Sequence, residues 1–280
     1  MKKKFKLFIL IAILTFAAGL SVVGFIPNAS AHGYTYWTST TKVGVGHFNY
    51  GEVNFVGDSD SGTNYSLVQR FNYHNNLFLM TLRGSFGYVP ATYSSMWASG
   101  SVHYLLNDFS AGVGIDPRLM GGLMQNELYL SLGDMTHDFI SANSVFSDGY
   151  TGYDESYQVK YLSLTYKNIY AFSPRFSNVF KAEYLTGLSG TDTTKELGKI
   201  GTAGSSTVPI YNNLEFNLGG ENGYDIAEGV RYRLTNSLSL VSDVYYSALF
   251  LKNSNTNAAY YEPSSMTHQY GLQAGVHIAF

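Results

Sequence analysis

The sequence predicts an all-β protein: a transmembrane antiparallel up-and-down β-barrel of about 10 strands, with about 12 strands as the alternative. Apolar and polar residues alternate over most of the chain, and this period of two is typical of strands. Aromatic residues reach 16% whereas charged residues reach only 13%, which suits a barrel with aromatic girdles at both membrane interfaces. A β-protein can cross hydrocarbon only as a closed barrel, because closure gives every backbone amide and carbonyl a partner.

Residues 1–31 predict a secretory signal peptide. Four lysines among residues 2–6 are followed by an apolar stretch at residues 7–25 and by Ala-Ser-Ala at residues 29–31. We expect cleavage after Ala31, and a retained membrane helix is the alternative. The chain has no Cys, so we expect neither a lipoprotein anchor nor disulfide bonds.

The first strands are expected at residues 42–55, 65–73 and 77–88. Glycines interrupt the alternation of the first one, whereas the other two alternate cleanly. The Gly-, Asp- and Ser-rich residues 57–63 predict a loop, and residues 74–76 predict a tight turn.

The next part of the chain is ambiguous. Residues 89–122 mix strand-like pieces with Gly and Pro, so they form either one long loop or an extra hairpin, which would raise the strand count to about 12. A clean strand at residues 123–132 precedes an expected turn at 133–135, a weak strand at 137–146 and a loop at 147–154.

The remaining strands are expected at residues 156–167, 176–188, 211–234, 238–250 and 264–280. The strand at 211–234 is either continuous or broken. Polar loops are expected at residues 189–208 and 252–263.

The last strand carries the most specific signal. From Tyr270 onward every second residue is apolar, and this alternation ends on Phe280. Such an ending resembles the closing strand of Gram-negative outer-membrane β-barrel proteins. The resemblance implies that residues 32–280 form an outer-membrane β-barrel in the cell outer membrane, in contact with outer-membrane lipids and lipopolysaccharide. It also implies that the barrel assembly machinery recognises Phe280. A soluble β-sandwich is the alternative, which this ending disfavours.

The breaks between strands differ in length. Short turns are expected at His74, Gly133, Ser173 and Asn236, and longer loops at Gly57, Val89, Ser147, Ser189 and Lys252. Because membrane barrels have short periplasmic turns and longer extracellular loops, we expect both chain termini on the periplasmic side.

Charged residues on the polar face of the strands are the candidate functional residues. We expect these side chains, with one histidine, to face the lumen: Arg70, Arg83, Glu127, Lys181, Glu183, Arg231, Arg233, Asp243 and His277. Either they line a narrow polar pathway, or they pair with one another and fill the barrel. The first reading predicts a small porin-like channel for ions or small solutes. The alternative is a structural or surface-interaction, adhesin-like barrel. The net charge of −3 disfavours a nucleic-acid partner.

No catalytic residues, cofactor or metal are expected. His137 with Asp134 and Asp138 resembles the acid/base groups of omptin-like barrel proteases, but an expected turn places them at the wrong end of the barrel. Ser265 with His268 is a chance pairing at the end of the last strand. Calcium binding by the aspartates of the first loop is less favoured than plain solvation. An outer-membrane hydrolase is therefore the least favoured function.

Glu228 conflicts with the expected register. It lies on the apolar face of its strand, where an ionised carboxylate in hydrocarbon is unfavourable. Either a bulge at Gly229 reorients it, or the position lies beyond the membrane.

Overall fold

The computed structural model describes residues 35–53, 58–75, 77–96, 98–119, 123–141, 144–147, 152–195, 214–256 and 261–280. The expected signal peptide lies outside these residues and stays a prediction. Within them, no helix is long and apolar enough to cross a membrane.

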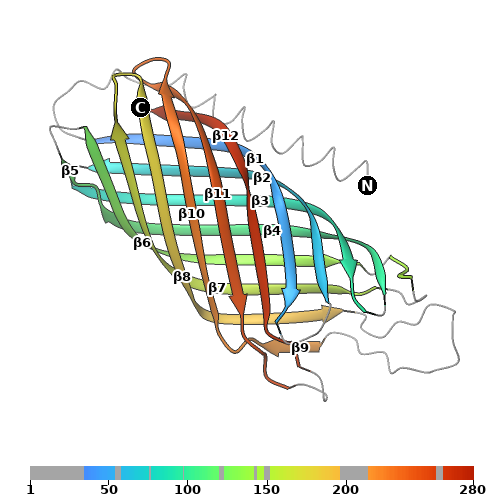
Figure 1. The fold of residues 1–280 in the computed structure, drawn as a ribbon. Coiled ribbons are helices and arrows are strands. Elements are labelled where there is room, and N and C mark those ends of the chain that lie inside the picture. Colours follow the sequence, from blue (N-terminus) through green and yellow to red (C-terminus); the bar gives the residue numbers. More distant parts are fainter. Residues whose placement is uncertain are drawn as a thin grey trace, which may run out of the picture.

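Ten long strands form one antiparallel sheet that closes on itself (Figure 1). They are β1 (Thr35–Glu52), β2 (Ser59–Asn75), β3 (Phe78–Ser94), β4 (Ser99–Ile115), β6 (Met124–Ile140), β7 (Asp154–Ala171), β8 (Phe176–Lys195), β10 (Glu221–Arg233), β11 (Leu238–Leu251) and β12 (Ser265–Ala279). Two short strands, β5 (Arg118–Leu119) and β9 (Leu214–Asn217), extend β6 and β8. Each long strand pairs with its neighbour along the chain, and β1 pairs with β12. The predicted barrel, with its strand count of ten, is confirmed.

The barrel is apolar outside and polar inside over the part of its strands that is nearer the end of the barrel where the C-terminus lies. Leu82, Leu132, Leu188 and Leu272 point outward and are 57–62% exposed, whereas the charges of the same strands point into the lumen. This is the reverse of a soluble barrel and is typical of a protein whose outer face contacts lipid.

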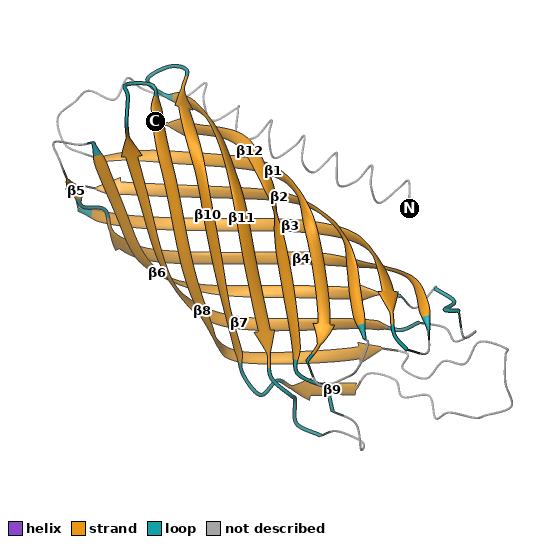
Figure 2. Ribbon diagram, in the orientation of Figure 1, coloured by secondary structure: helices purple, strands orange, loops and turns teal. Residues whose placement is uncertain are grey.

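The two ends of the barrel differ. Strands β2, β4, β7 and β10 end, and β3, β6, β8 and β11 begin, at the end of the barrel where the C-terminus lies, which we call the turn end (Figure 1). The opposite, loop end carries the other strand ends and, among the described residues, 53, 58, 95–96, 98, 141, 144–147, 152–153, 214–220, 252–256 and 261–264 (Figure 2). Both ends of the described chain therefore lie at the turn end.

The strands are longer than a membrane requires. A strand of 17 residues such as β2 spans about 56 Å, or roughly 43 Å of height at a tilt of about 40°. The apolar band of a membrane barrel is about 25 Å tall. The barrel therefore projects roughly 15–20 Å beyond the band, and it does so at the loop end, where outward residues such as Asn49, Thr63 and Gln158 are polar.

Two expected breaks were wrong. Residues 89–122 are neither a loop nor an extra hairpin, because β3 continues to Ser94 and β4 follows as a regular strand. The expected turn at Gly133 lies inside β6, so residues 124–140 are one strand rather than two. These errors offset each other in the strand count. Their common cause is that the apolar residues change face within a strand: Leu128, Leu130 and Leu132 point outward, but Met135 and Phe139 point inward.

The ambiguous stretch at residues 211–234 is broken. Gly220 separates β9 from β10 and has a φ of 140°, a conformation that favours glycine. Beyond the break, β10 pairs with β8 and β11 without a register shift at Gly229. The bulge expected there is absent, so Glu228 does point outward. The amide of Asn178, on neighbouring β8, donates a hydrogen bond to its carboxylate.

Candidate functional site: the lumen

An ion-pair network crosses the middle of the lumen. Arg83 Nη1 lies 3.3 Å from Asp108 Oδ2 and 3.5 Å from Glu183 Oε2. Lys181 Nζ lies 2.7 Å from the same Glu183 oxygen and 3.2 Å from Asp225 Oδ1. Strands β3, β4, β8 and β10 supply these residues, so the network links strands that are not adjacent in the sheet. It brings together three of the predicted lumen residues with two aspartates that were not predicted.

Two further contacts lie beside this network. Lys42 Nζ lies 2.6 Å from Asp243 Oδ2, joining β1 to β11. Arg70 Nη1 donates a hydrogen bond of 2.7 Å to the Tyr129 hydroxyl, and its guanidinium lies 5.8 Å from the centre of that ring. Arg70 and Asp243 thus have partners on strands that are not adjacent to their own.

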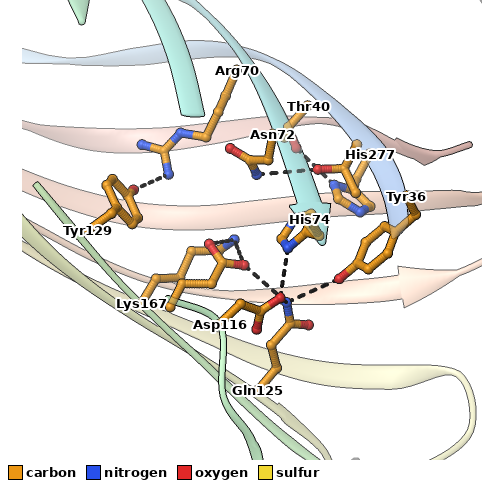
Figure 3. Close-up of polar contacts among 12 residues, drawn as sticks. Tyr36, Thr40, Arg70, Asn72, His74, Asp116, Gln125, Tyr129, Lys167 and His277 are labelled. Atoms are coloured by element: carbon orange, nitrogen blue, oxygen red, sulfur yellow. Dashed lines mark hydrogen bonds and ion pairs between the residues drawn. The ribbon is translucent and has the colours of Figure 1, made fainter. Parts of the chain in front are cut away.

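A second polar group occupies the turn end of the lumen (Figure 3). His74 Nδ1 lies 2.7 Å from Asp116 Oδ2, and its ring stacks on Tyr36 with centroids 4.3 Å apart. Gln125 Nε2 donates to the same Asp116 oxygen at 3.0 Å. Each of these groups comes from a different strand or turn, so their mutual hydrogen bonds hold the turn end together.

Glu127 and Lys167 form the most buried pair of a lysine or arginine with a carboxylate among the described residues. Lys167 Nζ lies 2.8 and 2.9 Å from the two carboxylate oxygens, and the Glu127 side chain is only 2% exposed. A charge this buried depends on its partner, because removal of one member leaves the other without compensation.

Cationic residues surround a cavity of about 330 Å³ at the turn end. Lys167, Arg231 and Arg233 line it, together with His277. His277 Nδ1 lies 2.8 Å from Thr40 Oγ1 (Figure 3). The Nε of Arg231 is buried and has no hydrogen-bond acceptor among the described residues. All of the predicted lumen residues thus lie inside the barrel or at its turn end.

Two smaller cavities lie along the lumen between this one and the loop end. They measure about 100 and 140 Å³, and both are lined by Arg83 and Asp225. Lys167 and Arg231 line the smaller one as well as the turn-end cavity. The lumen therefore contains a series of small polar cavities separated by charged side chains.

Two apolar clusters fill the lumen at the loop end. One contains Phe48 and Val89, each 0% exposed; the other contains Tyr161 and Val159, at 1% and 2%. The members of both clusters are Phe48, Val89, Ala91, Val102, Tyr104, Leu106, Phe139, Met135, Tyr157, Val159, Tyr161, Leu249 and Leu251. We call them the plug. Among the described residues, the plug is an apolar core inside the projecting part of the barrel.

Three carboxyl groups, which we call the acidic group, lie beside the plug on the loop-end side of the apolar outer band. Glu155, Asp192 and Glu262 place one oxygen each within 4.8 Å of one another. Burial, and then the neighbouring carboxylates, raise the pKa of Asp192 to about 8 and that of Glu262 to about 10. Burial also raises the pKa of Asp60, whose carboxylate accepts a hydrogen bond from Tyr104, to about 7.

The constellations considered for catalysis are separated by strand alternation. Asp134 and Asp138 point outward, where they accept hydrogen bonds from β7, while His137 points into the lumen. Ser265 is buried inside the barrel, while His268 points outward and contacts Tyr246. Neither group places an acid, a base and a nucleophile on one face.

No family model matches the chain, and no curated protein matches its sequence. Among solved structures, the barrel is similar to the outer membrane protease OmpT from Escherichia coli, with a TM-score of 0.57 at 9% identity. The match covers 91% of this chain and 100% of that chain. The chain has the fold of the Gram-negative outer-membrane β-barrels. The translocator domain of autotransporter NalP from Neisseria meningitidis matches with a TM-score of 0.42 at 10% identity, over 96% of this chain and 97% of that one. Identities this low bear on the fold alone.

Sequence reasoning missed several residues of this barrel's lumen. Lys167 and Asp225 lie opposite the outward apolar residues of their strands, so alternation was sufficient to find them. Lys42 belongs to the first strand, whose alternation is interrupted by glycines. Asp108 was missed because its strand was read as part of a loop. The acidic group was missed because its members come from two strand ends and a loop.

Proposed function

We propose that this barrel is closed to free diffusion and acts through its projecting loop end, as a surface-interaction protein of the outer membrane. The plug is the observation that carries this proposal: Phe48 and Val89 are fully buried in the part of the lumen that an open porin fills with water. Below the plug, paired charges occupy the lumen. We expect no enzymatic activity, and the lipid and assembly partners inferred from the last strand remain predictions.

The loops add a second argument. Four of them carry a large apolar side chain that is at least half exposed: Val53, Met96, Val145 and Tyr261. All four lie at the loop end, beyond the apolar outer band. Single exposed apolar residues are common, but several of them on loops that lie beyond the apolar outer band support contact with a partner surface.

A small porin-like channel is the second candidate, and the series of cavities favours it. The cavities run from the turn end to Leu106 and Leu249, where the plug begins. In this reading the plug is a gate that moves aside.

Conductance in planar bilayers distinguishes the two. We expect no steady current from the refolded barrel, and we expect current in the variant Phe48→Ala/Tyr104→Ala, which removes two rings from the plug. Steady current through the unchanged protein would overturn the proposal. Heat-dependent gel mobility shows whether each variant is folded.

The loop end is tested separately, on arrays of immobilised proteins and glycans. Cells that display the barrel should bind the arrays, and the variant Met96→Ser/Val145→Ser/Tyr261→Ser should lose that binding while its gel mobility stays unchanged. Binding that survives this variant would remove the role of the loop tips.

A further inference from the structure

Three carboxyl groups meet at the loop end without a cation. Glu155 begins β7, Asp192 lies near the end of β8, and Glu262 belongs to the loop before β12. Among the described residues, no lysine or arginine forms an ion pair with any of them. Their side chains nevertheless lie close enough that one oxygen of each falls within 4.8 Å of the others.

Asp192 is the least satisfied of the three. It is 0% exposed, and neither of its carboxylate oxygens accepts a hydrogen bond of good geometry from the described residues. Burial raises its pKa, and the Thr193 backbone N–H and the Thr194 hydroxyl, which lie near enough to lower that pKa, do not offset the burial. A buried carboxylate normally accepts several hydrogen bonds or pairs with a positive charge. The side chain points into the acidic group, so the missing partner belongs in that space.

Hydrogen bonding around the other two carboxyls is also incomplete. The Tyr157 hydroxyl lies 2.9 Å from Glu155 Oε2 and 2.6 Å from Glu262 Oε1. One hydroxyl hydrogen serves only one of these contacts at a time. Thr194 Oγ1 adds a distant donor to Glu155, at 3.4 Å. The group therefore requires additional positive charge, either as protons on the carboxyls or as a bound cation.

We propose that Glu155, Asp192 and Glu262 form a binding site for a divalent cation of the calcium type. Calcium takes six to eight oxygen ligands at about 2.3–2.6 Å, and carboxylates are its usual ligands. Oxygens within 4.8 Å of one another are reached by one such ion with small side-chain movements. The six carboxylate oxygens and the Tyr157 hydroxyl supply enough donors.

The bound ion would tie a loop to the barrel wall. Glu262 lies on a segment that is already held, since its backbone N–H donates to Ser254 Oγ at 2.7 Å and its carbonyl accepts from Ser254 N at 2.9 Å. The ion would connect this loop to the β7–β8 hairpin. The site thus bears on the shape of the loop end and does not depend on whether the lumen conducts.

Protons compete for the same site. Each carboxyl must be ionised to coordinate a cation, so a bound cation displaces any proton that the group holds. Affinity for the cation must therefore increase with pH.

Calorimetric titration of CaCl₂ into the refolded, EDTA-treated barrel in micelles tests the site. At about pH 8 we expect one saturable site and proton release. Asp192→Asn should weaken the affinity at least tenfold. Glu221→Gln is the matched control, because Glu221 is a buried carboxyl of the loop end, 4% exposed and also lacking a partner for Oε1, but lies outside the group. Its affinity should equal that of the unchanged protein.

Two results would overturn the proposal: no saturable calcium binding by the unchanged barrel, or equal affinity in Asp192→Asn. If Asp192→Asn does not fold by gel mobility, the unchanged protein still decides the question. Its affinity should then fall at least tenfold between about pH 8 and about pH 6, and an affinity independent of pH would count against carboxylate ligation.

Discussion

Removing the positive partner of Glu127 should destabilise the barrel strongly. In the variant Lys167→Met, the carboxylate remains 2% exposed and retains, among the described residues, only a hydrogen bond of 3.3 Å from Gln125 Nε2. Breaking a buried ion pair in this way costs about 3–5 kcal/mol, because the remaining charge is neither solvated nor paired. Replacing both partners, as in Lys167→Met/Glu127→Leu, removes the uncompensated charge and should restore most of the lost stability.

The assay is urea unfolding of the refolded barrel, followed by tryptophan fluorescence and gel mobility, with the free energy of unfolding obtained by linear extrapolation. The two single variants and the double variant form a cycle that isolates the pair. If Lys167→Met loses less than about 1 kcal/mol, water screens the pair as on a protein surface. The turn end of the lumen would then be hydrated rather than packed. A double variant as unstable as the single one would refute the reasoning in a different way, since the loss would then come from packing.

Three further outcomes are expected. In EDTA, stability should fall as pH rises from about 4 through about 8. The folded-state pKa of Asp192 is raised, so its stabilising contribution is complete below the unfolded-state pKa and is lost as pH rises through the folded-state pKa. Urea midpoints across this range show the decline, and Asp192→Asn should reduce it, leaving the part that comes from Asp60, Glu155 and Glu262. Gly133→Ala should lower the free energy of unfolding by about 1–3 kcal/mol, since its Cβ would overlap the buried ring of Tyr161. Gly51→Ala should be nearly neutral, because the atom nearest to that Cβ is 3.7 Å away. Equal urea midpoints for the two variants would contradict this. Deletion of Phe280 should impair membrane assembly more than Phe280→Ala, because the deletion also removes its two backbone hydrogen bonds to Trp37, and the folded fraction in outer-membrane preparations measures the difference.

Alternation was sufficient to predict which way most side chains point in the part of each strand that is nearer the turn end. Arg83 and Lys181 lie on the polar face of cleanly alternating strands, and both point into the lumen as that face requires. Alternation was not sufficient to pair them, because Arg83 and Glu183 meet across the lumen from strands that are not neighbours. Contacts between opposite walls depend on barrel size and strand tilt, which no local pattern specifies.

Strand β4 was missed for a packing reason. Its lower part reads as a break because Gly112 and Gly114 interrupt it, yet both glycines face the lumen. A Cβ at Gly112 would overlap Ser131, and one at Gly114 would overlap Tyr129, both on neighbouring β6. The glycines are therefore small to accommodate larger side chains beside them. A single sequence shows a glycine in the same way whether it ends a strand or makes room for a neighbour.

The change of apolar face within a strand is the sequence feature that links the fold to its membrane. In β7, Leu162 and Leu164 point outward, whereas Tyr157, Val159 and Tyr161 point inward and are 1–4% exposed. The side that needs apolar residues depends on the solvent outside the wall: lipid requires them outward, and water requires them inward. The switch therefore marks where the wall leaves the lipid.

The same switch falls between Val45 and Phe48 in β1 and between Leu132 and Met135 in β6. In the sequence, the switch resembles the end of one strand and the start of another, which is why a turn was expected at Gly133 within β6. Because the apolar face depends on the solvent outside the wall, the switch predicts both the projecting part of the barrel and the plug inside it. The residues that turn inward above the lipid have no other place to be buried, so a long outer-membrane barrel that projects into water tends to close its own lumen at that end.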